Sequence, residues 1–244
     1  MRCRGGFTLV ELLTVIIIIA ILAAMLVGAV TYAVTSMNQA AIRQEIGQLE
    51  AALNAYKSEY GEYPPDGTDT TEVTNHIKRC YRNARATGIS ITDPNGSSVT
   101  RPNPQNVLQV FLGPHNADPT KPFTVSLKAT SADSLTKPFF EFDQNRLSKD
   151  YTYLPRNCSE PYYYRKATIS KGKGNYTGNQ NYPTYKDADG NWYNPTTFQI
   201  VSAGLDNDLG DKTSNGIKVD DNLSGESLDN ISNVAPKTLK DLLE

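Results

Sequence analysis

One apolar tract near the N-terminus constrains this 244-residue chain more than any other feature. Of the 28 residues from 7 to 34, 23 are hydrophobic, although hydrophobic residues make up only 39% of the whole chain. No charged residue lies between Leu12 and Ala41. A helix needs about 20 apolar residues to cross the hydrocarbon core of a bilayer, and the stretch from Leu9 to Val30 supplies them. The tract therefore indicates a membrane-spanning helix or a secretory signal.

The residues around the tract indicate its orientation. Arg2 and Arg4 precede it in a six-residue leader without acidic residues, which places the N-terminus in the cytoplasm and the bulk of the chain outside. The alternative is an ordinary secretory signal with a small-residue cleavage site at 27–29. Glu11 argues against that alternative, because a charged group inside hydrocarbon costs about 2.5–3.5 kcal/mol or more. A signal that is cleaved and degraded does not require a carboxylate at this position.

The residues at this boundary, GGFTLVELL at 5–13, closely resemble the start of type IV prepilins and type II secretion pseudopilins. In that family a prepilin peptidase cuts after the glycine, on the cytoplasmic side, and the new N-terminal residue is methylated. The resemblance implies cleavage between Gly6 and Phe7, methylation of Phe7, and an assembly role for Glu11. As the fifth mature residue, Glu11 would neutralise the N-terminal amine of a neighbouring subunit.

The apolar pattern continues beyond the membrane tract as one stripe of an amphipathic helix. Its residues recur at spacings of three and four, and they are Ile42, Ile46, Leu49, Leu53, Tyr56 and Tyr60. Gly61 and then Pro64-Pro65 end the helix. Together with the resemblance, this pattern predicts a leader at 1–6, a transmembrane assembly helix at 7–34, its amphipathic continuation at 35–60 and a head at 61–244. The fold class is α+β, and the resemblance implies a pilin-like fold.

The head is expected to combine short helices with an antiparallel sheet. A capping box formed by Asp69 and Glu72 opens a helix over 69–88, and a short helix is expected at 107–112. Short β-type runs follow, with turn residues between them, at 123–129, 139–143, 151–155, 161–169 and 196–204. One face of the sheet should cover the helix stripe. Asp189-Gly190 indicates a hairpin turn, which we prefer to a metal loop at 187–190.

The cysteines fit an exported head. Cys3 leaves with the leader, and the two that remain, Cys80 and Cys158, can pair in an oxidising compartment. Such a bridge would contribute roughly 4.5 kcal/mol on the chain-entropy model. Two unpaired, partly buried thiols are the alternative, and the sequence leaves the choice open.

The loop at 205–232 is strongly acidic and suits calcium, which takes six to eight oxygen ligands. Seven acids lie between Asp206 and Asp229, against two lysines. The spacing is not that of an EF-hand. The segments SAGLD at 202–206 and LDNISN at 228–233 resemble the calcium loop of major pseudopilins. That resemblance implies carboxylate ligands from Asp206 and Asp229, with Leu205 and Ser232 as further oxygen donors. Because of a longer insert, Asp208, Asp220 or Asp221 are alternative ligands, and a merely solvated loop is the competing interpretation.

Composition and motifs exclude several functions. A net charge of −2 gives no electrostatic footprint for nucleic acid. No catalytic motif occurs, and His76 and His115 are too isolated in sequence to suggest a metal pair. We therefore expect no enzyme.

The expected function is a structural subunit of a type II secretion pseudopilus, which prepilin peptidase processes and which polymerises through its N-terminal helix. The expected partners are copies of the chain and an inner-membrane secretion or pilus assembly platform. The expected location is the inner membrane, with a periplasmic head, and a filament after assembly. The alternatives are a type IV pilin and a membrane-tethered binding module that uses the tyrosines at 162–164.

Overall fold

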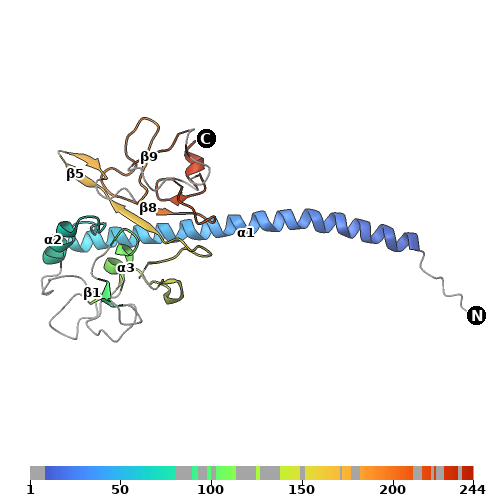
Figure 1. The fold of residues 1–244 in the computed structure, drawn as a ribbon, viewed down its shortest axis with the longest axis horizontal. Helices are drawn as coiled ribbons and strands as arrows, with labels where there is room; N and C mark the ends of the chain where they lie inside the picture. The colour runs from blue at the N-terminus through green and yellow to red at the C-terminus, as the bar shows by residue number, and fades with distance from the viewer. Residues whose placement is uncertain are drawn as a thin grey trace, which may run out of the picture. The chain divides into compact units, whose positions relative to one another are not determined.

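The structure, a computed structural model, describes residues 9–80, 90–92, 98–99, 103–113, 125–126, 138–148, 152–170, 172–176, 182–210, 216–220, 223, 228–235 and 238–243. The chain forms two compact units, Met1–Asn38 and Gln39–Glu244. Helix α1, Leu9–Tyr60, contributes to both units. A long N-terminal helix and small, mainly antiparallel β-sheets confirm the predicted α+β class and are consistent with a pilin-like fold (Figure 1).

The part of α1 that belongs to the second unit forms the spine of the head. The predicted stripe is buried at Ile42, Ile46, Leu49, Leu53 and Tyr56. The helix ends where the sequence predicts, because Gly61 adopts a φ of 83° and its N–H donates to the Lys57 carbonyl at 2.7 Å. A glycine tolerates this left-handed conformation without a steric penalty.

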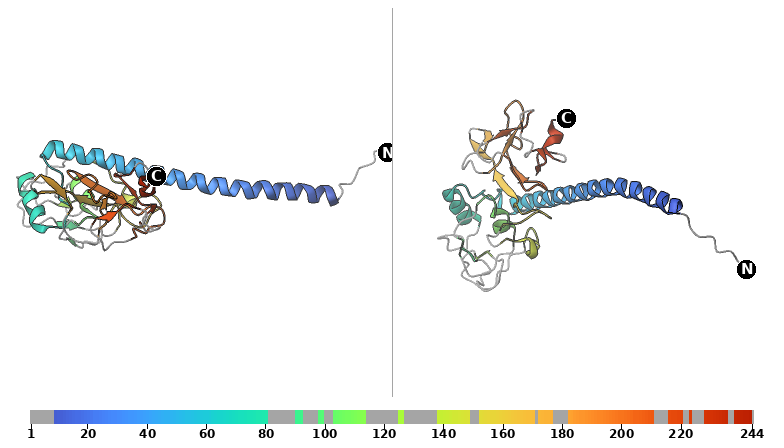
Figure 2. Two further views of the ribbon diagram at one scale, coloured as in Figure 1. Left: turned by 90° about the horizontal axis from the view of Figure 1, so that it is seen from above. Right: turned by 45° about the vertical axis from the view of Figure 1, so that its right-hand side comes forward.

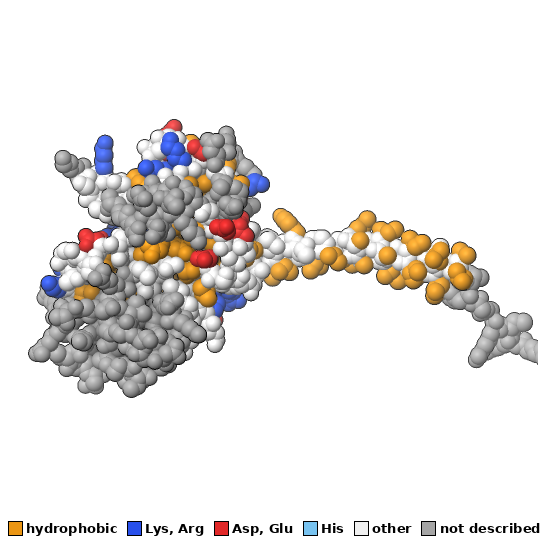
Figure 3. All heavy atoms as spheres, in the orientation of Figure 1, with side chains coloured by type: hydrophobic (Ala, Val, Ile, Leu, Met, Phe, Trp, Pro, Cys, Tyr) orange, Lys and Arg blue, Asp and Glu red, His pale blue; other side chains and the backbone are white. Residues whose placement is uncertain are grey.

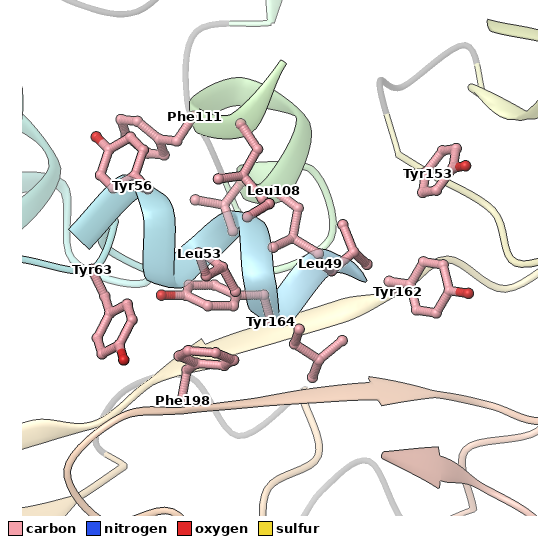
Figure 4. Packing of buried hydrophobic residues seen from close by; sticks show 14 of the residues in the cluster. Leu49, Leu53, Tyr56, Tyr63, Leu108, Phe111, Tyr153, Tyr162, Tyr164 and Phe198 are labelled. Carbon is pink, nitrogen blue, oxygen red and sulfur yellow. The ribbon is translucent and has the colours of Figure 1, made fainter. Parts of the chain in front are cut away.

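A three-stranded antiparallel sheet packs on that spine. Its strands are β4 (Tyr163–Lys166), β8 (Phe198–Ser202) and β10 (Ile231–Ser232), in the order β10-β8-β4. Tyr164, Phe198 and Ile200 share one hydrophobic core with the helix stripe, as Figure 4 shows for several members. Figures 1 and 2 show these strands lying against the second half of α1. The predicted contact between sheet and stripe is confirmed.

The opposite face of the same sheet is covered as well. Tyr163 and Val201 point to this face because side chains alternate along a strand, and they join a second core with Tyr185, Ala203, Leu209, Val219 and Leu239. Every residue of β8 is buried. A strand covered on both sides is the rigid element from which the acidic loop begins.

The remaining elements are short. The other helices are α2 (Thr70–Cys80), α3 (Val107–Leu112), and the 3-10 turns η1 (Gln144–Arg146) and η2 (Leu239–Leu242). A second three-stranded sheet consists of β1 (Ser90–Thr92), β2 (Ser98–Val99) and β3 (Val125–Ser126). Two further sheets have two strands each: β5 (Thr168–Ser170) pairs with β6 (Lys173–Asn175), and β7 (Tyr185–Lys186) pairs with β9 (Ile217–Lys218). The pairing of β7 with β9 is parallel, which the sequence did not indicate.

A buried ion pair ties β4 to the segment that follows α1. Arg165 Nε donates to Asp66 Oδ2 at 2.9 Å, and the two side chains are 1% and 4% exposed. Asp66 Oδ1 also accepts from the Thr68 amide and hydroxyl. Because a buried charge is costly without its partner, this pair fixes how the chain leaves the helix and meets the sheet.

Three β-type runs of the sequence form different structures. The run at 139–143 is not a strand, because the amides of Phe139 and Phe140 donate to the Leu112 carbonyl and the phenylalanines pack as an aromatic cluster. The run at 151–155 contributes one bridge, between Tyr153 and Leu147. The run at 161–169 divides between β4 and β5. The predicted turn at Asp189-Gly190 is confirmed: Gly190 has a φ of 89°, and its amide donates to the Asp187 carbonyl at 3.0 Å.

Candidate functional site

The first unit presents a helix whose apolar side chains are exposed on all sides. Between Leu9 and Met37 every residue is exposed, and Leu9 and Met25 are 79% and 70% exposed. Figure 3 shows the hydrophobic side chains that cover this helix. By length and composition it is able to cross a membrane. An apolar surface of this extent requires lipid or protein around it.

Polar groups on this helix are compatible with an apolar surrounding. The Thr31 hydroxyl donates to the Gly28 carbonyl at 2.9 Å, and the Thr35 hydroxyl donates to the Thr31 carbonyl at 3.0 Å. The Thr14 hydroxyl donates to the Glu11 carbonyl at 3.0 Å. These bonds satisfy the donors of the three threonine hydroxyls within the helix.

Glu11 lies in the first turn of α1 and is exposed. A carboxylate is favourable in the first turn because the helix dipole is positive there. The predicted processing residues Gly6 and Phe7 lie outside the described residues. Among the described residues from Leu9 to Ala41, Glu11 is the one acidic group.

After strand β8, the structure brings together two of the predicted calcium ligands. The Asp206 and Asp229 side chains share a hydrogen bond, and Asp229 also accepts from the amides of Leu205 and Asp206. Burial, and then the charge of Asp206, raise the pKa of Asp229 to about 6. The Asp229 Oδ1 atom is buried and lacks a hydrogen-bond partner. Two carboxylates that approach this closely are favourable only with a shared proton or a cation between them.

Gly204 makes this approach geometrically feasible. It has a φ of 74°, and a Cβ atom there would lie 2.6 Å from Asp229 Oδ2 and 2.7 Å from the Asp229 carbonyl oxygen. Only glycine fits the position. Asp206 Oδ1 in turn accepts from the Asp208 amide at 2.8 Å, and Asp208 Oδ1 accepts from the Gly210 amide at 2.9 Å. Hydrogen bonds from backbone amides to the carboxylates of Asp206 and Asp208 therefore stabilise this turn.

The other expected oxygen donors have different surroundings. The Ser232 hydroxyl is buried and donates to the Ile200 carbonyl at 2.7 Å, which joins β10 to β8. The Leu205 carbonyl accepts from the Asn207 side chain at 3.5 Å. Asp208 is exposed and Asp220 is partly exposed, whereas Asp221 lies outside the described residues.

The expected Cys80–Cys158 disulfide is not formed, because the two thiols have different neighbours. Both cysteines are free. Cys158 Sγ donates to the Gly204 carbonyl at 3.0 Å, and burial raises the pKa of this thiol to about 11, with Asp229 and Asp206 contributing. Cys80 lies instead at the end of α2 beside Glu62 and His76. Of the two alternatives that the sequence leaves open, the structure shows the unpaired, partly buried thiols, and it places Cys158 beside the acidic turn, which the sequence did not indicate.

The tyrosines at 162–164 do not form an exposed binding patch. Tyr162 and Tyr164 are fully buried, and Tyr163 is 4% exposed. The Tyr162 hydroxyl donates to Glu45 on α1 at 2.7 Å, and the Tyr164 hydroxyl donates to the Pro64 carbonyl at 2.9 Å. They are core residues, so the interpretation of these side chains as a recognition surface is wrong.

Comparison with known protein families matches residues 1–27 to the prokaryotic N-terminal methylation motif. No curated protein and no solved structure matches the chain. The motif covers the leader, the expected cleavage site and the first part of α1, which is also where the structure exposes an apolar helix. In general this motif implies processing by a prepilin peptidase and assembly into a filament. The N-terminal motif and the helix that follows it thus support a type IV pilin-like protein.

Proposed function

We propose that the chain is a structural subunit of a type II secretion pseudopilus. In this role prepilin peptidase cuts between Gly6 and Phe7, Phe7 is methylated, and the mature subunits polymerise through the first half of α1. The observation that carries the proposal is the exposed apolar helix that begins within a prepilin-type motif. The role is structural, and the chemistry is performed on the chain by the peptidase.

The same helix serves two successive environments. Before assembly, lipid covers its apolar side chains while the head remains in the periplasm. In the filament, the corresponding helices of other copies cover them. Burial of apolar area contributes about 25 cal/mol per Å² in either case, so the transfer between the two environments is nearly neutral for the apolar residues. The charge of Glu11 then distinguishes the filament from the bilayer, because in the filament a neighbouring subunit provides an amine for it.

The acidic turn favours a pseudopilus over a type IV pilus in this proposal. Asp206 and Asp229 are held together at the end of β8, and an oxygen of Asp229 is buried without a hydrogen-bond partner. Calcium accepts such carboxylate and main-chain oxygens. We assign the pair to one calcium ion, with Leu205 and Ser232, the other residues that the resemblance implies, at its periphery.

The calcium assignment predicts a specific pH dependence. The pKa of Asp229 is raised to about 6 in the folded chain, above its usual value near 4. Without calcium, this group therefore contributes stability below about pH 4 that is lost as the pH rises through about 6. Calcium favours the ionised pair. The calcium-dependent rise in melting temperature should therefore be largest above pH 6 and should fade toward pH 4.

The measurement is the melting temperature with calcium minus that with chelator, taken across this pH range. Titratable groups that calcium does not contact affect both melting temperatures equally, so their contributions cancel in the difference. Asp206→Ala and Asp229→Ala should each abolish the calcium-dependent shift, whereas Asp187→Ala, at a partly exposed carboxylate in another turn, should keep it. Magnesium should substitute poorly because it demands a smaller octahedral site. An unchanged melting temperature at millimolar calcium would show that the loop is only solvated.

The cellular role is tested by deletion of the gene and complementation with the wild-type chain. A pseudopilus subunit is needed for export, so secreted proteins should accumulate inside the deletion strain while surface pili remain. Loss of surface pili with normal export would instead assign the chain to a type IV pilus. Normal export and normal pili, with an unassembled membrane protein, would favour the tethered binding module.

A further inference from the structure

The junction between α1 and α2 brings together three side chains of metal-binding type that the proposed function does not use. Glu62 follows the helix-ending Gly61, and His76 and Cys80 lie one turn apart on α2. Residues at this spacing face the same side of a helix. Each residue offers one potential ligand atom, and these three atoms all lie within 4.8 Å of one another.

The distances within the cluster are close to those of a metal site. His76 Nδ1 lies 2.9 Å from Glu62 Oε1, and Cys80 Sγ lies 3.8 Å from His76 Nδ1 and 3.9 Å from Glu62 Oε1. Ligand atoms around a tetrahedral zinc ion are separated by about 3.4–3.6 Å, given metal–ligand bonds of about 2.0–2.3 Å. Shifts of about half an ångström convert the present arrangement into a tetrahedral face. We propose that Glu62, His76 and Cys80 form a three-ligand site for Zn²⁺.

The residues around His76 support its role as a ligand. His76 is 1% exposed, and its second ring nitrogen, Nε2, lies 2.7 Å from the Tyr56 hydroxyl on α1. Metal-binding histidines have a partner on the other ring nitrogen, which fixes the ring orientation. Burial lowers the pKa of His76 to about 4, against the opposing effect of Glu62. The imidazole is therefore neutral at physiological pH, which is the form that binds a metal.

The proton balance of metal binding follows from these contacts. Without metal, Nδ1 donates its proton to the Glu62 carboxylate, so Nε2 accepts from the Tyr56 hydroxyl. With metal on Nδ1, the ring proton moves to Nε2 and is donated to the Tyr56 oxygen. Cys80 loses its thiol proton, because the thiolate is the metal ligand. One proton is released for each ion bound, and Zn²⁺ with Glu62 and the Cys80 thiolate has no net charge.

Two cations adjoin the cluster, and neither blocks it. The Arg79 guanidinium donates to Glu62 Oε1 at 2.6 Å, but its side chain is 57% exposed and can turn into solvent. Lys166 is held by Glu72, with 2.7 Å between Nζ and Oε1. Glu62 and Cys80 are both partly exposed, which gives an ion access to the cluster, and Glu62 also lines an open pocket of about 330 Å³. The ion would fasten α2 to the end of α1.

The test uses the full chain in detergent under reducing conditions, in a Cys3→Ser background that removes the leader thiol. Titration of the metal-free chain with Co²⁺ should give a thiolate-to-cobalt charge-transfer band that saturates at one ion per chain. Cys80→Ser should abolish the band. Cys158→Ser is the matched control, since Cys158 is also a free thiol near carboxylates, and it should keep the band.

A second readout separates a metal site from a purely structural hydrogen-bond cluster. Zn²⁺ should raise the melting temperature of the Cys3→Ser and Cys158→Ser chains but not that of Cys80→Ser, and Glu62→Gln should weaken zinc binding at least about tenfold. Absence of a saturable cobalt band in the folded parent chain would overturn the proposal. The proposal would also be wrong if the band were lost in Cys158→Ser and kept in Cys80→Ser. Neither result depends on filament assembly.

Discussion

Replacement of Glu11 with glutamine is expected to reduce the yield of sheared fibres at least about tenfold while membrane insertion and folding of the head remain normal. The amide has nearly the same shape as the carboxylate but cannot neutralise the Phe7 amine of a neighbouring subunit. Two unit charges 4 Å apart gain about 4 kcal/mol at an effective dielectric of 20, and each 1.4 kcal/mol corresponds to a factor of ten in an equilibrium. Even a partial loss of this attraction disfavours assembly strongly.

The position of Glu11 is the reason why we expect its charge to matter for assembly and not for the fold. It lies in the first unit of the chain, whereas the two hydrophobic cores lie in the second. Glu59→Gln is the matched control, because it makes the same chemical change at an exposed site of the same helix within the head. The control should assemble normally. Equal fibre yields for Glu11→Gln and the wild type would show that the charge pair is dispensable.

Much of the head could be predicted because its signals are local or periodic. The three-and-four spacing from Ile42 to Tyr56 identified the buried face of α1, and Gly61 identified its end. The helix at 107–112 and the turn at Asp189-Gly190 were also predicted correctly. The resemblance at 202–206 and 228–233 predicted that Asp206 and Asp229 would meet, and the structure brings their side chains together.

The failures concern contacts between residues far apart in the sequence. The phenylalanines at 139–142 have strand propensity, but the amides of Phe139 and Phe140 donate to the Leu112 carbonyl at the end of α3, so tertiary packing overrides propensity. The sequence allowed Cys80 a disulfide with Cys158 because cysteines in exported chains pair often, and it left unpaired thiols as the alternative. His76 and Cys80 are four residues apart on a helix, and this spacing was the signal in the sequence for the cluster with Glu62. His76 was compared only with His115, so this spacing was not used.

The site of N-terminal cleavage decides whether the chain can assemble, because the proposed filament requires the apolar helix to remain in the mature chain. Ordinary signal cleavage after 27–29 would remove most of the exposed apolar helix and Glu11 with it. Prepilin-type cleavage removes only the leader at 1–6, which carries both arginines that precede the tract. The two routes therefore leave different proteins: a free head in the first case, and a filament subunit with a charged amine four residues before Glu11 in the second.

The measurement that tests this claim most directly is the mass of the N-terminal peptide of the chain extracted from membranes of cells with prepilin peptidase. We expect a mature chain that begins at Phe7 and carries one methyl group on its N-terminal amine. The same chain from cells without the peptidase should keep residues 1–6. A mature N-terminus at Val30, Thr31 or nearby would contradict the filament proposal, because the helix that the proposal assigns to assembly would be absent from the mature protein.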